Sequence, residues 1–193
     1  MARKKFEFRQ DKTGPDLLSK LYLTQKQRLS LVKWSLFALV ILVLSLLQDV
    51  ILCHLNIWGA STDLLPCAIF VAGVMLGAED GGVFSLVAAA YYQFSGSAPG
   101  YYVIAIIPVL TVLAALFRQS YLRKSAGANI LCAAIAFALY EGILLGIGLL
   151  SEQTVLFRSG TFLVTILITL LTVPLLYPLF SAIGRIGGET WKE

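Results

Sequence analysis

The chain has 193 residues, of which 58% are hydrophobic and only 13% are charged, whereas a soluble domain has roughly 25% charged residues. A soluble domain of this length could not hide so much apolar surface, because a short chain leaves much of itself facing the solvent. We therefore expect an all-α integral membrane protein, built as a bundle of six transmembrane helices.

The N-terminal segment, residues 1–33, carries most of the positive charge. It holds nine of the fifteen Lys and Arg residues. Such a tail could bind nucleic acid, but beside a first apolar run it is more typical of a cytoplasmic segment that is attracted to anionic lipid headgroups. We therefore expect contact with membrane lipid and none with nucleic acid. Within the tail, residues 16–33 could form an interfacial helix.

Six apolar runs follow and define a transmembrane domain over residues 34–185. We expect spans over about residues 34–55, 64–78, 81–95, 100–117, 127–150 and 160–183. The second and third runs are about 15 residues long, where roughly 20 are needed to cross a bilayer. They could be two thin spans or a re-entrant hairpin that protein shields from lipid. Residues 186–193 would form a short C-terminal tail.

The distribution of Lys and Arg supports six crossings with both termini in the cytoplasm. With that topology, fourteen of these residues lie on the inner side and only Arg158 lies outside. A single net crossing by residues 64–95 would instead move five basic residues outside, against the tendency of Lys and Arg to stay in the cytoplasm. Those five residues are Arg118, Arg123, Lys124, Arg185 and Lys192.

No catalytic motif is recognisable. The single histidine excludes a multi-histidine metal cluster, and the sequence contains no GxxxxGK[ST], GxSxG or HExxH pattern. The cysteines Cys53, Cys67 and Cys132 form no CxxC pair and lie in or beside apolar runs. We therefore expect no enzyme activity, no catalytic residue, no metal site and no cofactor.

Glu141 lies in the middle of the fifth predicted span. An ionisable group at that depth costs at least a few kcal/mol unless it is paired or protonated. Glu141 could contact a partner helix, bind a ligand or a proton, or make a structural hydrogen bond within the bundle.

Two groups of glycines occur at intervals of four residues. The first is formed by Gly73, Gly77 and Gly81, and the second by Gly142 and Gly146. Small residues at this spacing let helix backbones approach closely. They are candidates for an interface with a partner protein, although packing inside one chain is the alternative.

Further polar candidates lie at the predicted outer ends of the helices: Gln48, Asp49, Asp63, Gln93 and Tyr101. Asp63 could cap the second helix, and Tyr101 could anchor the chain at the membrane interface.

Several short motifs occur in a fixed order along the chain: Leu46-Leu47-Gln48-Asp49, Asp63-Leu64-Leu65, the glycine-rich turn 77–82, the turn 96–101, Tyr140-Glu141 and Pro178-Leu179-Phe180. This order resembles the MreD family, the bacterial rod shape-determining membrane proteins. The resemblance covers roughly residues 34–185 and departs from the family pattern at Gln93, where the family often has Asp, and at Thr62, where it often has Pro.

The resemblance implies a non-catalytic scaffold in the bacterial cytoplasmic (inner) membrane. Its expected partner is an MreC-like single-span membrane protein, and peptidoglycan elongation synthases and the cytoskeletal filament protein would join it, directly or indirectly. The alternative is a substrate-binding subunit of an energy-coupling-factor vitamin transporter, because such subunits are also six-helix proteins of this size. Its outer pocket would use Asp49, His54, Trp58, Tyr101 and Tyr102.

Overall fold

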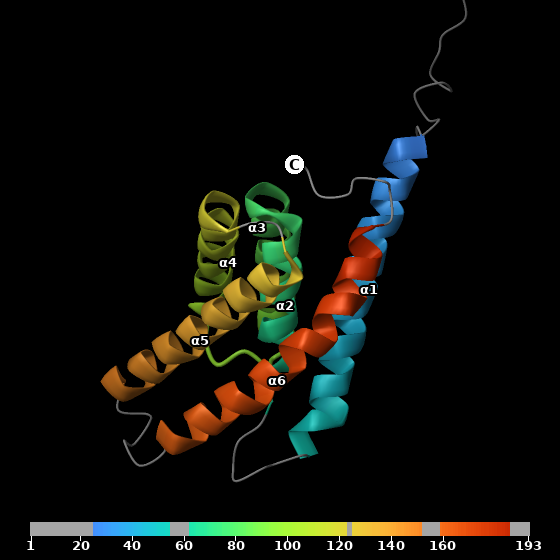
Figure 1. Ribbon diagram of the computed structural model, residues 1–193. Helices are drawn as coiled ribbons and strands as arrows, with labels where there is room; N and C mark the ends of the chain where they lie inside the picture. The colour runs from blue at the N-terminus through green and yellow to red at the C-terminus, as the bar shows by residue number, and fades with distance from the viewer. Residues whose placement is uncertain (1–24, 55–61, 123–124, 152–158, 186–193) are drawn as a thin grey trace, which may run out of the picture.

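The computed structural model describes residues 25–54, 62–122, 125–151 and 159–185 (Figure 1). No strand occurs in these ranges, so the all-helical class is confirmed. The predicted C-terminal tail, 186–193, and residues 1–24 of the predicted N-terminal tail lie outside them. The helices are α1 (Gln25–Val50), the short 3-10 helix η2 (Leu52–His54), α2 (Leu64–Leu76), α3 (Ala78–Phe94), α4 (Val103–Tyr121), α5 (Ala126–Leu150) and α6 (Ser159–Gly184).

The first helix begins before the first predicted span. It runs without a break from Gln25, so residues 25–33 continue directly into the apolar stretch that starts at Trp34. No glycine or proline separates the two stretches, and Gln, Lys, Arg and Leu are good helix formers. The predicted boundary at residue 33 is therefore a change of polarity within one helix and not the end of a separate interfacial helix.

Among the residues that the structure describes, four helices are long and apolar enough to cross a membrane, namely α1, α4, α5 and α6, which makes the chain a helical membrane protein. The 13 residues of α2 and the 17 residues of α3 extend over roughly 20 and 26 Å at 1.5 Å per residue. The hydrocarbon core of a bilayer is about 30 Å thick. The second and third helices are thus short, as the apolar runs predict.

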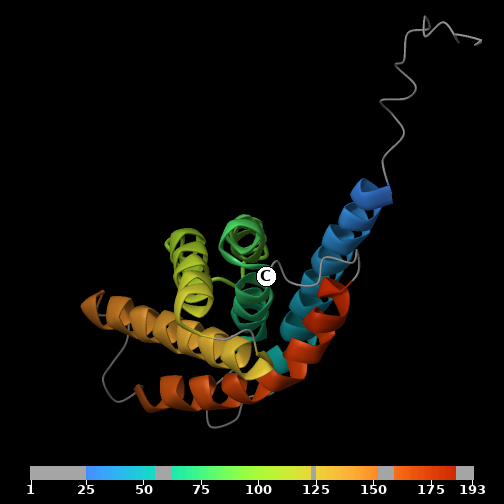
Figure 2. The same ribbon diagram turned by 45° about the horizontal axis from the view of Figure 1, so that its top comes forward.

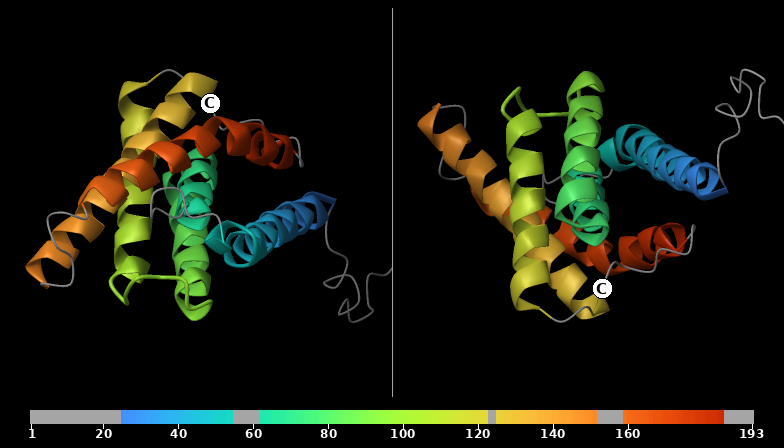
Figure 3. Two further views of the ribbon diagram at one scale, coloured as in Figure 1. Left: turned by 90° about the horizontal axis from the view of Figure 1, so that it is seen from below. Right: turned by 90° about the horizontal axis from the view of Figure 1, so that it is seen from above.

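The short helix α2 lies at the centre of the bundle. It packs against α1, α3, α4, α5 and α6, and every residue from Leu64 to Met75 is buried. In both views of Figure 3, α2 and α3 lie between α1 and α4. Because protein surrounds α2, its backbone and its apolar side chains do not need lipid to cover them.

The turn between α2 and α3 depends on glycine. Gly77 separates the two helices with a φ of +98°, a conformation that side chains disfavour. A Cβ atom on Gly77 would lie 3.0 Å from the side-chain nitrogen of Gln119, in the last turn of α4. The α2–α3 turn therefore reaches the level at which α4 ends, and α3 runs antiparallel to α4 beside nearly its whole length.

The last two helices cross the others obliquely (Figures 1 and 2). Consecutive helices alternate in direction, so the end of α6 returns to the end of the bundle where α1 begins. There the rings of Phe37 in α1 and Phe180 in α6 stack with their centroids 5.8 Å apart. Pro174 and Pro178 lie inside α6 and do not interrupt it.

Candidate functional site

Polar side chains converge where α2 begins. The side-chain oxygen of Gln48, in the last turn of α1, accepts a hydrogen bond from the Leu65 N–H at 2.7 Å. The hydroxyl of Thr169 in α6 accepts one from the Asp63 N–H at 3.3 Å. The first N–H groups of a helix have no partner inside the helix, so these side chains tie the start of α2 to α1 and α6. Asp63 occupies the N-cap position, but its side chain makes no capping hydrogen bond.

A second acidic group, Glu141 in the middle of α5, lies near Asp63. Glu141 is only 2% exposed. Burial raises the pKa of Asp63. Two acidic groups that are far apart in the sequence therefore lie near each other where α2 and α5 pack together.

Two tyrosines border this pair. Tyr92, near the end of α3, and Tyr140, beside Glu141 in α5, are both fully buried. Asp63 and Glu141 lie near enough to both tyrosines to influence them electrostatically. The Tyr140 ring is held at 5.8 Å from the ring of Phe70 in α2, measured between centroids. The two acidic groups and the two tyrosine hydroxyls form a polar cluster inside an otherwise apolar bundle.

Several polar atoms in and around the cluster have no hydrogen-bond partner among the described residues. A buried polar atom without a partner costs about 1–3 kcal/mol, and in a membrane no water compensates for it. Polar groups retained at this cost are typical of function rather than of packing. The atoms are the hydroxyls of Thr62, Tyr92 and Tyr140, and the Oε1 atoms of Gln93 and Glu141.

The structure brings together three of the polar residues that the sequence singles out, namely Gln48, Asp63 and Glu141. Asp49 lies at the rim, where its carboxylate accepts a hydrogen bond from the Ser97 hydroxyl at 2.9 Å. Tyr101 is 86% exposed and takes no part in the cluster.

Sequence reasoning did not select Tyr92 and Thr169 as site residues. Both lie in apolar helices, and nothing in their neighbouring residues indicates which of the six helices they face. The hydrogen bond of Thr169 with the start of α2, and the proximity of Tyr92 to Asp63, become visible only in the folded bundle.

The first glycine group packs inside the chain. Gly73, Gly77 and Gly81 are buried, and a Cβ atom on Gly81 would overlap the carbonyl oxygen of Gly73. A Cβ atom on Gly73 would overlap the methyl group of Thr111 in α4. These glycines allow α2, α3 and α4 to approach one another, so a partner helix cannot reach them in this arrangement. The structure therefore supports the alternative of packing inside the chain for Gly73, Gly77 and Gly81, and their role in a partner interface stays a prediction.

The second glycine group does not pack against the other helices. Gly142 is exposed and Gly146 is half-buried, and no atom lies within 4 Å of a Cβ built on either residue. This face of α5 is open, and its role in a partner interface stays a prediction.

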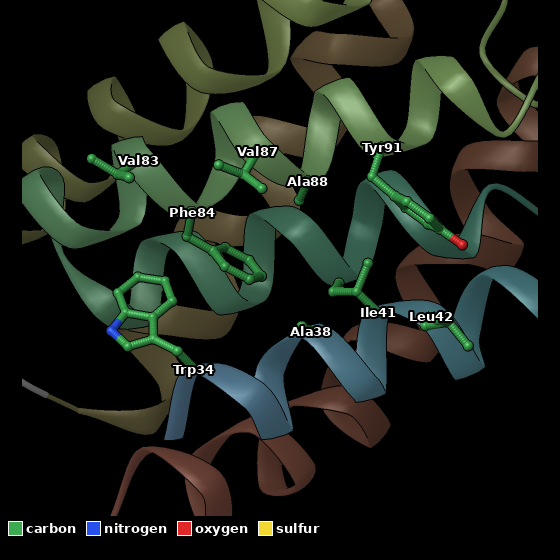
Figure 4. Close-up of a pocket in the computed structure, with 9 residues that line it drawn as sticks. All are labelled: Trp34, Ala38, Ile41, Leu42, Val83, Phe84, Val87, Ala88 and Tyr91. Carbon is green, nitrogen blue, oxygen red and sulfur yellow. The ribbon is translucent and has the colours of Figure 1, made fainter. Parts of the chain in front are cut away.

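A groove that the sequence does not reveal runs between α1 and α3. Its volume is about 430 Å³. Figure 4 shows Trp34 and Phe84 at one end and Leu42 and Tyr91 at the other. The ring centroids of Trp34 and Phe84 are 6.2 Å apart, so this contact closes that end. The groove is lined by Trp34, Ala38, Ile41, Leu42, Val83, Phe84, Val87, Ala88 and Tyr91.

At the opposite end of the bundle from the polar cluster, a basic side chain is buried. Arg118 donates a hydrogen bond to the Asn129 side-chain oxygen at 2.6 Å, joining α4 to α5. The predicted fourth span ends at residue 117, with Arg118 in the following loop. In the structure α4 continues to Tyr121 and Arg118 is buried in its last turns. The long side chain can keep this helical position because Asn129 satisfies part of its hydrogen-bonding capacity.

Within the described ranges no three His, Cys, Asp or Glu residues are arranged to hold a metal ion. Comparisons of the chain with models of protein families, with curated proteins and with solved structures found no match. Function must therefore be inferred from the motifs of the sequence and from the geometry of the groove and the polar cluster.

Proposed function

We propose that this protein is a non-catalytic membrane scaffold of the MreD type, which binds the transmembrane helix of an MreC-like single-span partner. The observation that carries the proposal is the apolar groove between α1 and α3, together with the motif order that resembles the MreD family. Through its partner the scaffold would take part in the cell-wall elongation machinery of the bacterial cytoplasmic membrane.

The shape of the groove suits a helix. Its α3 wall carries Val83, Val87 and Tyr91 at intervals of four residues, and all three are exposed. Residues at this spacing form one stripe along a helix. Ala38 and Ala88 lie between the larger side chains at the two ends (Figure 4). Small residues there would let the backbone of another helix approach closely.

The proposal includes six crossings with both termini in the cytoplasm. The support comes from α3, which runs beside α4 for most of its length, while α4 is itself long enough to span. Gly77, in the turn between α2 and α3, lies beside Gln119 in the last turn of α4. This position favours a hairpin that crosses the whole membrane rather than a re-entrant loop that turns back halfway. Arg118 lies at that same end, which agrees with a cytoplasmic side rich in Lys and Arg.

A second candidate function is the substrate-binding subunit of an energy-coupling-factor vitamin transporter. The polar cluster around Asp63 and Glu141 favours it, because a substrate pocket needs polar groups that converge near the outer end of the bundle. A vitamin that raises the melting temperature of the purified protein would support this alternative over the scaffold.

Site-specific photo-crosslinking in native membranes tests the scaffold. A photoreactive amino acid at Val87, which is 65% exposed in the groove wall, should crosslink to a single-span protein with an extracytoplasmic domain. The matched control is Leu171 on α6, which is 78% exposed and outside the groove. Crosslinks to lipid alone at Val87 would show that the groove holds acyl chains, and equal protein crosslinks at both positions would remove the groove from the interface.

Filling the groove with a larger side chain should weaken binding of the partner. In Ala38→Trp the larger side chain would occupy the space of the partner helix, while Ala105→Trp places the same side chain on an exposed position of α4. Overpacking costs about 1–3 kcal/mol, so we expect co-purification of the partner to fall by roughly tenfold for Ala38→Trp. Equal recovery from both variants would contradict the proposal.

A further inference from the structure

We propose that a second groove, between α4 and α5, binds an acyl chain of an anionic phospholipid whose phosphate is held at the basic end of these two helices. The α4–α5 groove shares no residue with the groove between α1 and α3. The lipid site is therefore independent of the scaffold proposed above, and only its assignment to the cytoplasmic leaflet rests on the proposed topology.

The α4–α5 groove is an apolar slot that is open to the membrane. Its volume is about 270 Å³. It follows α5 from Cys132 to Leu139, which is about 10 Å at 1.5 Å per residue. Small side chains that are buried or half-buried form its floor, and large side chains that are each more than half exposed form its walls. The floor consists of Ala114, Cys132 and Ala136, and the walls include Leu113, Phe117 and Leu139.

Positive charge gathers at one end of the α4–α5 groove. Phe117 lies at that end, and Arg118 follows it in α4 and donates its hydrogen bond to Asn129 of α5. Asn129 lies one turn before Cys132, so this cationic group is close to the end of the slot. The sequence that joins the two helices contains Arg123 and Lys124. The N-terminus of α5 lies here as well, and its dipole adds positive potential.

The opposite end of the α4–α5 groove is uncharged, and no acid borders the slot. Neither lining segment, 110–117 or 132–139, contains an acidic residue. Glu79 and Asp80 lie near the end of α4, in the first turn of α3. Among the described residues, however, α3 packs on α4 and makes little contact with α5. The charge at the basic end of the slot is therefore positive overall, while the rest of the slot is apolar.

This combination determines the kind of ligand. A free phosphate would use only the basic end, and an uncharged hydrocarbon would use only the slot. A phospholipid uses both, because Arg and Lys donate strong hydrogen bonds to phosphate oxygens and each buried CH₂ group of a lipid chain adds affinity. Basic pockets between transmembrane helices on the cytoplasmic side are typical sites for anionic headgroups. We therefore assign the slot to a phospholipid of the cytoplasmic leaflet.

Native mass spectrometry of the full-length protein in detergent tests the headgroup. The wild type should retain one phosphatidylglycerol, and about tenfold less phosphatidylcholine with the same acyl chains. Replacing both Arg123 and Lys124 by glutamine should lower retention of phosphatidylglycerol by about tenfold or more. The matched control replaces Arg28 and Arg185 by glutamine, which removes the same charge from exposed positions outside the slot. Equal retention of the two lipids, or an equal loss in both double variants, would overturn the proposal.

A second set of measurements tests the slot itself. Ala114→Trp fills the floor and should lower retention of phosphatidylglycerol, whereas Ala105→Trp, at an exposed position of α4 outside the slot, should not. If Ala114→Trp does not fold, a short-chain phosphatidylglycerol on the wild type gives the same comparison. It keeps the headgroup but buries fewer CH₂ groups, so it should be retained less.

Melting temperatures distinguish the lipid from free phosphate. Phosphatidylglycerol should raise the melting temperature of the wild type by about 3 °C or more, and inorganic phosphate should leave it unchanged. An equal effect of inorganic phosphate, or undiminished retention of the short-chain lipid, would show that the slot holds no acyl chain. A second copy of the chain in the mass spectrum in place of the lipid would assign the slot to a protein interface and would also overturn the proposal.

Discussion

Replacing Gly81 by alanine tests whether the first glycine group holds the α2–α3 hairpin together. A Cβ atom at this position would overlap the carbonyl oxygen of Gly73 and lie 2.9 Å from its carbonyl carbon. Both are backbone atoms of α2, so no side-chain rotation can relieve the overlap. The two helices would have to move apart, although α2 is enclosed by five other helices.

The magnitude follows from two opposing effects. Overpacking of a buried site costs about 1–3 kcal/mol, and the upper end of this range applies because the obstacle is backbone. Alanine regains about 1 kcal/mol over glycine in a helix interior. The net loss is about 2 kcal/mol, which lowers the melting temperature of a chain of this size by roughly 4–8 °C.

Thermal unfolding in detergent, followed by tryptophan fluorescence, is a suitable assay. Gly142→Ala is the matched control, because Gly142 is also helical but has open space where its Cβ would be. The control should be neutral or more stable by up to about 1 kcal/mol. If Gly81→Ala were as stable as Gly142→Ala, the close packing of α2 on α3 would be refuted and the first glycine group would become available for a partner protein.

Two further predictions concern packing at the end of the bundle where α1 begins. Phe180→Ala removes the ring that stacks on Phe37 and should cost about 3 kcal/mol or more, whereas the exposed Leu171→Ala should change the melting temperature little. Asn129→Ala removes the acceptor of the buried hydrogen bond from Arg118, so unfolding measurements should show a loss of about 1.5–3 kcal/mol; a change within experimental error would mean that the remaining contacts of Arg118 suffice.

The positions of the helices could be predicted well from hydropathy. The apolar runs 127–150 and 160–183 correspond to α5 (Ala126–Leu150) and α6 (Ser159–Gly184) within one residue at each end. A helix in lipid needs about 20 apolar residues, and a charge at its end costs free energy, so composition alone marks the boundaries. Arg118 is the exception, because a tertiary hydrogen bond lets it remain in a buried helical turn.

The arrangement of the helices could not be predicted in the same way. A helix in lipid and a helix buried in protein are both apolar on every side, so α2 shows no periodicity that would reveal its central position. The same reason hides the groove, whose walls consist of ordinary lipid-compatible residues. Glu141 was predicted to need a partner or a proton, but its neighbour Asp63 could not be identified, because their proximity depends on how α5 packs on α2.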